Sequence, residues 1–167
     1  LGRHNTGNRK QAETSVAKKY LFVHQNFPAQ FVHVAEALAR QGNEVVALAI
    51  KGRAVPGVRL MRYAVTPLAR VSALEAARDL ETKILRGSAC AQAMEALKRD
   101  GFVPDVVVAH PGWGEALFCK DVWPAARLVI YAEFFYGTED SDYGFDKELF
   151  QDATAARARL RLKNSVH

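Results

Sequence analysis

Short and almost wholly apolar runs recur along the chain, separated by turns or by stretches with helical spacing. The clearest runs cover residues 19–24, 45–50, 106–110 and 127–135, and a more alternating run covers residues 58–65. A strand with one solvated face alternates apolar and polar residues, whereas a strand covered on both faces is apolar throughout. The sequence therefore predicts an α/β fold, a Rossmann-like doubly wound parallel sheet of at least five strands.

The stretches between the predicted strands have the features of helices. Residues 28–42 repeat apolar side chains at helical spacing, with Pro28 suited to the first turn and Gly42 to the C-terminal cap. Further helices are predicted over residues 72–99, 112–122 and 146–166, and the first of these could break near Gly87. Strand and helix thus alternate, as parallel strands require.

The length and charge of the chain restrict its class. The 167 residues suffice for one domain of ordinary size. The first 18 residues carry four basic side chains against one acidic, so they hold +3 of the net charge of +5 and leave +2 for the other 149. This balance argues against a nucleic-acid partner. Residues 1–18 are polar and aperiodic and are predicted to be a disordered extension or an expression remnant, with 19–167 as the folded domain.

The expected compartment follows from cysteine usage and from the apolar runs. No run approaches the roughly 18 residues of a membrane span, and no signal-peptide pattern is visible. Cys90 and Cys119 lie 29 residues apart without a CxxC motif. One disulfide is formally possible, but two free thiols in a reducing compartment are favoured. A cytoplasmic location is therefore expected.

The residues that follow each predicted strand are the candidates for a site, because ligands of doubly wound folds bind beyond the carboxyl ends of the strands. Three such sets would meet at one rim of the sheet, although they are far apart in sequence. The first contains His24, Gln25 and Asn26, the second runs from His110 to Glu115, and the third contains Glu133, Phe134 and Tyr136.

Several common sites are disfavoured by missing motifs. The turn after the first strand lacks the glycines of GxGxxG, and no GxxxxGK[ST] occurs, so a dinucleotide-binding domain and a P-loop are not expected. No metal site is expected either, because neither HxxxH nor HExxH is present and no cysteine lies near His24 or His110 in sequence.

Each candidate has a structural alternative. His24 and His110 are either hydrogen-bonded structural residues or functional groups. Glu133, at the end of an apolar strand, either accepts hydrogen bonds from a sugar hydroxyl or pairs with His110 or an arginine. The backbone N–H groups of Gly112 and Gly114 either receive an anion or a sugar hydroxyl, or these glycines serve a purely steric purpose.

Four segments resemble the N-terminal domain of bacterial family-4 glycosyltransferases. They are HQNFPAQF at residues 24–31, ALARQGNEV at residues 37–45, PDVVVAHPGWGE at residues 104–115 and YAEFFY at residues 131–136. The HPGWGE and EFFY strings are the most specific, and the resemblance covers about residues 20–165.

This resemblance implies the GT-B architecture, in which two Rossmann-like domains face each other across a cleft, with retaining stereochemistry and no obligatory metal or cofactor. The N-terminal domain mostly holds the acceptor, and the C-terminal domain binds the nucleotide sugar. The chain matches only the N-terminal half, so its own C-terminal domain is an expected partner, and the isolated chain is expected to be inactive.

Carried over to this sequence, the resemblance implies that His110 and Glu133 position the acceptor as the catalytic pair. Pro28 and Ala29 stand where relatives often have a glycine pair that touches the donor phosphates, and Glu133 stands where many have histidine. The implied cleft residues are His24, Gln25, Asn26, Pro28, Ala29, Gly112, Trp113, Gly114, Glu115, Phe134 and Tyr136.

The leading hypothesis is thus the acceptor-side domain of a retaining glycosyltransferase. It would transfer a sugar from a nucleotide-sugar donor to a glycan or lipid-linked acceptor, in the cytoplasm or at the inner face of the membrane, in polysaccharide biosynthesis. The alternative is a stand-alone Rossmann-like binding module for a small anionic metabolite or a protein partner.

Overall fold

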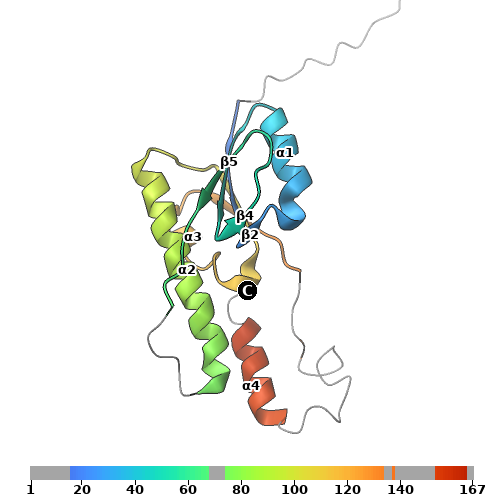
Figure 1. Cartoon of the computed structure of the whole chain (residues 1–167), viewed down its shortest axis with the longest axis vertical. Helices are drawn as coiled ribbons and strands as arrows, with labels where there is room; N and C mark the ends of the chain where they lie inside the picture. The colour runs from blue at the N-terminus through green and yellow to red at the C-terminus, as the bar shows by residue number, and fades with distance from the viewer. Residues whose placement is uncertain (1–15, 68–73, 134–136, 138–152, 165–167) are drawn as a thin grey trace, which may run out of the picture.

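A five-stranded, all-parallel sheet forms the centre of the molecule (Figure 1). The computed structural model describes residues 16–67, 74–133, 137 and 153–164. The strands are β1 (Lys19–Val23), β3 (Glu44–Ala49), β5 (Val58–Arg62), β6 (Val106–Ala109) and β7 (Arg127–Ile130), in the order β5-β3-β1-β6-β7. The predicted Rossmann-like α/β sheet is confirmed. Its switch point lies between β1 and β6, because the chain moves outward from β1 to β5 and then crosses to β6.

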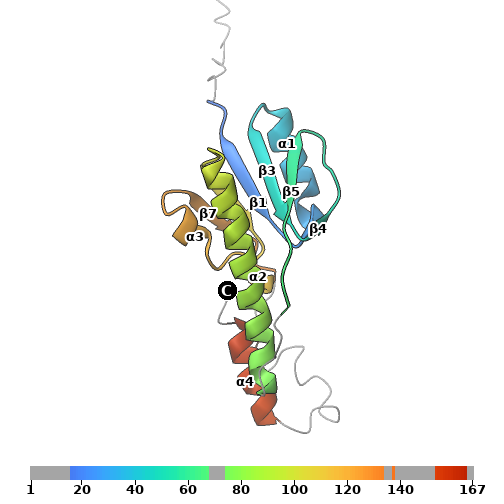
Figure 2. The ribbon, with the colours of Figure 1, turned by 60° about the vertical axis from the view of Figure 1, so that its left-hand side comes forward.

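The two faces of the sheet are covered by different helices. Helix α1 (Val32–Arg40) packs on the face to which Phe22 and Ala47 point, while α2 (Glu75–Arg99) and α3 (Cys119–Val122) pack on the face of Leu21 and Val46. Successive side chains of a strand point to opposite faces, so the all-apolar runs supply both cores. Figure 2 shows α2 crossing in front of the sheet, with α1 behind it.

Helix α1 begins and ends close to the predicted positions. A single 3₁₀ turn, η1 (Ala29–Phe31), follows Pro28 and leads into the helix. Gly42 has φ of 84° and donates its N–H to the Ala39 carbonyl, so the chain leaves the helix through the left-handed conformation that favours glycine.

Two helix predictions need correction. Helix α2 is continuous through Gly87. This glycine does not break the helix but allows close packing, because a Cβ at position 87 would lie 2.6 Å from the Gly114 carbonyl oxygen. The helix predicted over residues 112–122 is instead the 3₁₀ turn η2 (Pro111–Trp113) followed by the four-residue α3. The two segments are separated at Gly114, whose φ of 98° is incompatible with a continuous helix.

A two-stranded ladder was not predicted. Strand β2 (Asn26–Phe27) pairs in parallel with β4 (Lys51–Gly52) just beyond the ends of β1 and β3. A Cβ at Gly52 would lie 2.8 Å from the Phe27 carbonyl oxygen, so the close approach of these two segments requires glycine there.

Helix α2 extends beyond the sheet, where α4 (Ala153–Asn164) packs beside it (Figures 1 and 2). Arg159 Nε donates to Asp79 Oδ2 at 2.9 Å, and this hydrogen bond lowers the pKa of the Asp79 carboxyl. The Lys83 ammonium, in a buried side chain, donates to the Lys163 carbonyl at 2.7 Å. Burial, followed by the charge of Lys163, lowers the pKa of Lys83. The described α4 lies inside the predicted range 146–166, of which 146–152 and 165–166 are outside the described residues.

Both cysteines are free and buried in the core, in agreement with the favoured prediction. Burial raises the pKa of each thiol, to about 12 for Cys119.

We expect both thiols to react with a disulfide reagent at least about a hundredfold more slowly in the folded protein than in urea, because little thiolate forms and access requires local opening. Timed thiol titration with and without urea tests this. Release of one equivalent within the mixing time of the native protein would contradict it.

No helix in the described part of the chain is long and apolar enough to cross a membrane.

Candidate functional site

Three side chains that follow different strands meet at the carboxyl edge of the sheet. His24 follows β1, His110 follows β6, and Glu133 lies three residues beyond β7. The imidazole ring centroids of His24 and His110 are 5.5 Å apart, and His110 Nε2 lies 3.0 Å from Glu133 Oε2. The structure thus brings together the three residues that the sequence analysis placed on one rim.

The tautomer of His110 follows from its two hydrogen bonds. The backbone N–H of Gly112 donates to His110 Nδ1 at 3.1 Å, so in the neutral ring the proton is on Nε2, which donates to Glu133. The imidazole is buried, whereas the Glu133 side chain is 58% exposed. The histidine therefore holds a carboxylate that faces outward from the rim.

His24 is a neutral, buried partner of this pair. Its Nδ1 accepts the backbone N–H of Asn26 at 3.0 Å. Burial, assisted by the nearby His110 and opposed by Glu133, lowers the pKa of His24 to about 4. His24 is therefore uncharged at neutral pH.

Two aromatic rings lie beside His110 at the rim. The Trp113 ring stacks on it with centroids 6.4 Å apart and planes inclined by 28°, and the Tyr131 ring is also 6.4 Å away. Trp113 is 42% exposed and Tyr131 is 44% exposed. Exposed ring faces beside a carboxylate combine apolar contact area with a hydrogen-bond acceptor, which suits a polyhydroxylated ligand.

The turn after β6 uses its own N–H groups internally. Gly112 donates to His110, and Gly114 donates to the Pro111 carbonyl at 3.2 Å. A Cβ at Gly114 would overlap the backbone of Lys83, so this glycine allows α2 to touch the turn. Both N–H groups are thus engaged within the turn, and a steric role is shown for Gly114.

Glu115 lies in the interior rather than in the cleft to which the sequence analysis assigned it. Its side chain is 1% exposed, and Oε1 accepts a hydrogen bond from the Tyr63 hydroxyl at 3.3 Å. Oε2 has no hydrogen-bond partner among the described residues. Burial raises the pKa of this carboxyl, which favours its neutral form.

The loop after β1 is split between the core and the surface. Pro28 is buried, while Gln25 and Asn26 face a cavity and Ala29 is exposed. Ala29 has φ of 42°, a left-handed conformation that is unusual for a residue with a Cβ. The backbone at this position thus has a conformation that glycine adopts readily, although alanine stands there. Phe134 and Tyr136, also assigned to the cleft, lie outside the described residues.

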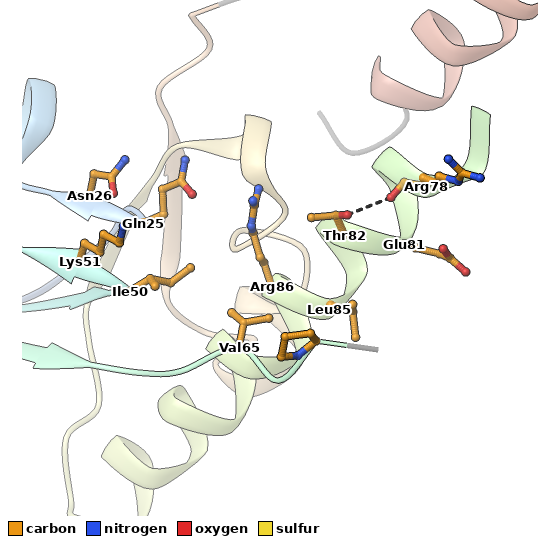
Figure 3. Close-up of a pocket in the computed structure, with 11 residues that line it drawn as sticks. Gln25, Asn26, Ile50, Lys51, Val65, Arg78, Glu81, Thr82, Leu85 and Arg86 are labelled. Carbon is orange, nitrogen blue, oxygen red and sulfur yellow. Dashed lines mark hydrogen bonds between the residues drawn. The ribbon is translucent and has the colours of Figure 1, made fainter. Parts of the chain in front are cut away.

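Sequence analysis missed a cavity of about 600 Å³ between these loops and α2 (Figure 3). Lys51 and Arg86 are among its lining residues. Lys51 begins β4, two residues beyond the end of β3, so the rule that singled out His24 and His110 would have found it. Arg86 belongs to a long helix that carries many charged residues, and spacing alone gives no reason to single it out.

In the described part of the chain, no group of three or more histidine, cysteine or acidic side chains is arranged to hold a metal ion.

The five-stranded parallel sheet with helices on both faces is that of a Rossmann-like domain. The family model for the glycosyl transferase family 4 group matches residues 41–167. The chain belongs to this family, and the resemblance found in the sequence is confirmed. No curated protein matches the chain.

Proposed function

We propose that the chain forms the acceptor side of a retaining glycosyltransferase, which moves a sugar from a nucleotide-sugar donor to a glycan or lipid-linked acceptor. Family membership supports glycosyl transfer as the reaction class. The observation that carries the acceptor assignment is the outward-facing Glu133 carboxylate held by His110. The donor is proposed to bind mainly to a second domain, so the isolated chain is expected to be inactive.

The two oxygens of Glu133 have different roles in this proposal. Oε2 accepts the hydrogen bond from His110, and Oε1 makes no hydrogen bond to the described residues. Oε1 can therefore accept a hydrogen bond from an acceptor hydroxyl and fix its orientation toward the donor sugar. His110 acts as a positioning residue, because both of its ring nitrogens are engaged. Trp113 and Tyr131 offer ring faces to the acceptor.

The second candidate is a stand-alone module that binds a small anionic metabolite or a protein partner. The cavity with its cationic lining is the observation that favours it. Family membership favours the transferase, and the cavity is compatible with an acceptor site. A cytoplasmic location and a role in polysaccharide biosynthesis stay predictions.

Replacing Glu133 by glutamine in the full-length protein is expected to lower kcat/KM for transfer at least tenfold. The amide oxygen can still accept the His110 hydrogen bond, but the amide NH2 then stands in the place of Oε1 and cannot accept a hydrogen bond from the substrate hydroxyl. His110→Ala should have a comparable effect because the carboxylate loses its fixed orientation. Nucleotide release is measured with a panel of nucleotide sugars and sugar acceptors.

His33→Ala is the matched control, because His33 is an exposed histidine of α1 and is not one of the side chains described at the rim. Turnover of Glu133→Gln or His110→Ala within about twofold of the His33→Ala control would show that the pair does not position the acceptor.

A further inference from the structure

The cavity beside α2 has an excess of positive charge. Among its lining residues are the cationic side chains Lys51, Arg78 and Arg86 and one carboxylate, Glu81. Gln25 and Thr82 add neutral polar groups from opposite walls, and Figure 3 shows Arg86 extending from α2 toward Gln25. A concave site with convergent polar groups and more cationic than acidic side chains favours an anionic ligand.

The charge of Arg86 has no direct ion-pair partner among the described residues. The side chain is half-buried, and its guanidinium forms no ion pair or hydrogen bond with the described residues. The guanidinium lies over the Trp113 ring, whose centroid is 5.6 Å from Arg86 Cζ. A guanidinium has five N–H donors in a fork that matches a carboxylate or phosphate, so leaving all of them unpaired in a half-buried position is costly.

The nearby acidic side chain Glu115 is a poor counter-charge. It interacts electrostatically with Arg86 but forms no ion pair with it within 4 Å. Burial raises the pKa of Glu115, and no direct ion pair with this carboxyl neutralises the Arg86 guanidinium.

A chain of contacts joins the cavity to the rim. Arg86 lies against Trp113, Trp113 stacks on His110, and His110 holds Glu133. A ligand that places a charged group at Arg86 therefore lies on the same side of the molecule as the proposed hydroxyl-binding carboxylate, with the indole and imidazole rings between the two positions.

From this arrangement we infer that the acceptor is an anionic sugar, whose phosphate or carboxylate group is bound by Arg86 in the cavity while its reacting hydroxyl faces Glu133. The inference rests on the proposed function and adds the substrate class to it. Lys51 contributes a second positive charge at the opposite wall. Phosphate and carboxylate groups both present two oxygens that a guanidinium can bind through two parallel hydrogen bonds.

The test is calorimetric titration of the full-length protein with glucosyl phosphate, glucuronate, glucose and UDP. Glucosyl phosphate or glucuronate should bind at least tenfold more tightly than glucose, and the stronger of the two identifies the anionic group. Arg86→Met keeps the aliphatic stem but removes the charge, and it should weaken this binding at least tenfold without changing binding of glucose. The affinity of Arg86→Lys for the anionic sugar should lie between those of the unchanged protein and of Arg86→Met, because an ammonium keeps the charge but lacks the forked donors of a guanidinium.

Arg59→Met is the matched control. Arg59 is an exposed arginine of β5 whose guanidinium lies over the Phe102 ring at 5.7 Å, so this variant also loses one charge and one cation–π contact, but outside the cavity. Equal affinities of Arg86→Met and Arg59→Met for both anionic sugars would overturn the inference. Binding of UDP alone in an Arg86-dependent manner would also overturn it, because the cavity would then serve the donor.

Glu133→Gln separates this inference from the proposed function. That variant should keep Arg86-dependent binding of the anionic sugar, because its carboxylate is not part of the anion site. Arg86-dependent binding together with unchanged transfer by Glu133→Gln would contradict the catalytic role while leaving the anion site in place. Loss of transfer by Glu133→Gln without any Arg86-dependent binding would contradict the anion site alone.

Discussion

Replacing Gly114 by alanine is expected to lower the free energy of unfolding by about 3 kcal/mol or more. The added Cβ would lie 2.6 Å from the carbonyl carbon of Lys83 and closer still to its oxygen. These are backbone atoms of α2 and cannot move aside as a side chain can. The φ of 98° adds strain for any residue with a Cβ. Urea denaturation followed by circular dichroism measures the loss.

Gly101→Ala separates the backbone strain of a positive φ from the steric overlap between an added Cβ and α2. Gly101 has φ of 84°, but a Cβ there would meet nothing within 4 Å. This variant should lower the free energy of unfolding by about 1 kcal/mol, which is the contribution of the backbone strain alone. Equal losses for the two variants would mean that α2 does not touch the turn at Gly114 as described.

The second large effect is acid sensitivity caused by His24. Its pKa is about 4 in the folded protein and 6.5 in the unfolded chain, so between these pH values the unfolded state binds a proton that the folded state does not. The free energy of unfolding therefore falls as the pH is lowered, by about 1.4 kcal/mol per pH unit and by about 3 kcal/mol over the whole window. Above pH 6.5, His24 no longer contributes to the slope of the free energy of unfolding against pH. Urea denaturation at several pH values measures it.

His24→Asn should remove this part of the pH dependence. An asparagine Oδ1 can accept the N–H two residues ahead, so the bond to the Asn26 backbone can be kept without a titrating group. His33→Asn, the same substitution at an exposed histidine, is the matched control. Other titrating groups act in all three proteins and cancel in the comparison. An unchanged slope in His24→Asn would show that His24 is not the group responsible.

Sequence periodicity was sufficient for the sheet and for the assembly of the rim. All-apolar runs require a sheet covered on both faces, and parallel strands bring their carboxyl ends to one edge. The sequence thus predicts that His24 and His110 lie at the same edge. That they meet follows from the pairing of β1 with β6, which the structure supplies.

The direction of individual side chains could not be derived in the same way. Glu115 follows a strand like His110, yet the left-handed Gly114 turns the chain and places this carboxyl in the interior. The same conformation ends η2, where periodicity suggested one longer helix. Arg86 gains its significance only from packing between distant segments, which no local pattern encodes.

The contact between α2 and the turn after β6 also has an evolutionary consequence. A side chain at position 87 would meet the Gly114 carbonyl oxygen, and one at position 114 would meet Lys83. Neither position can acquire a larger residue unless the helix first shifts away from the turn, and that shift would separate Arg86 from Trp113. Family members that keep this geometry should therefore retain glycine at both positions. Members that have lost one glycine should show compensating changes along the helix, and their acceptor preference should have diverged as well.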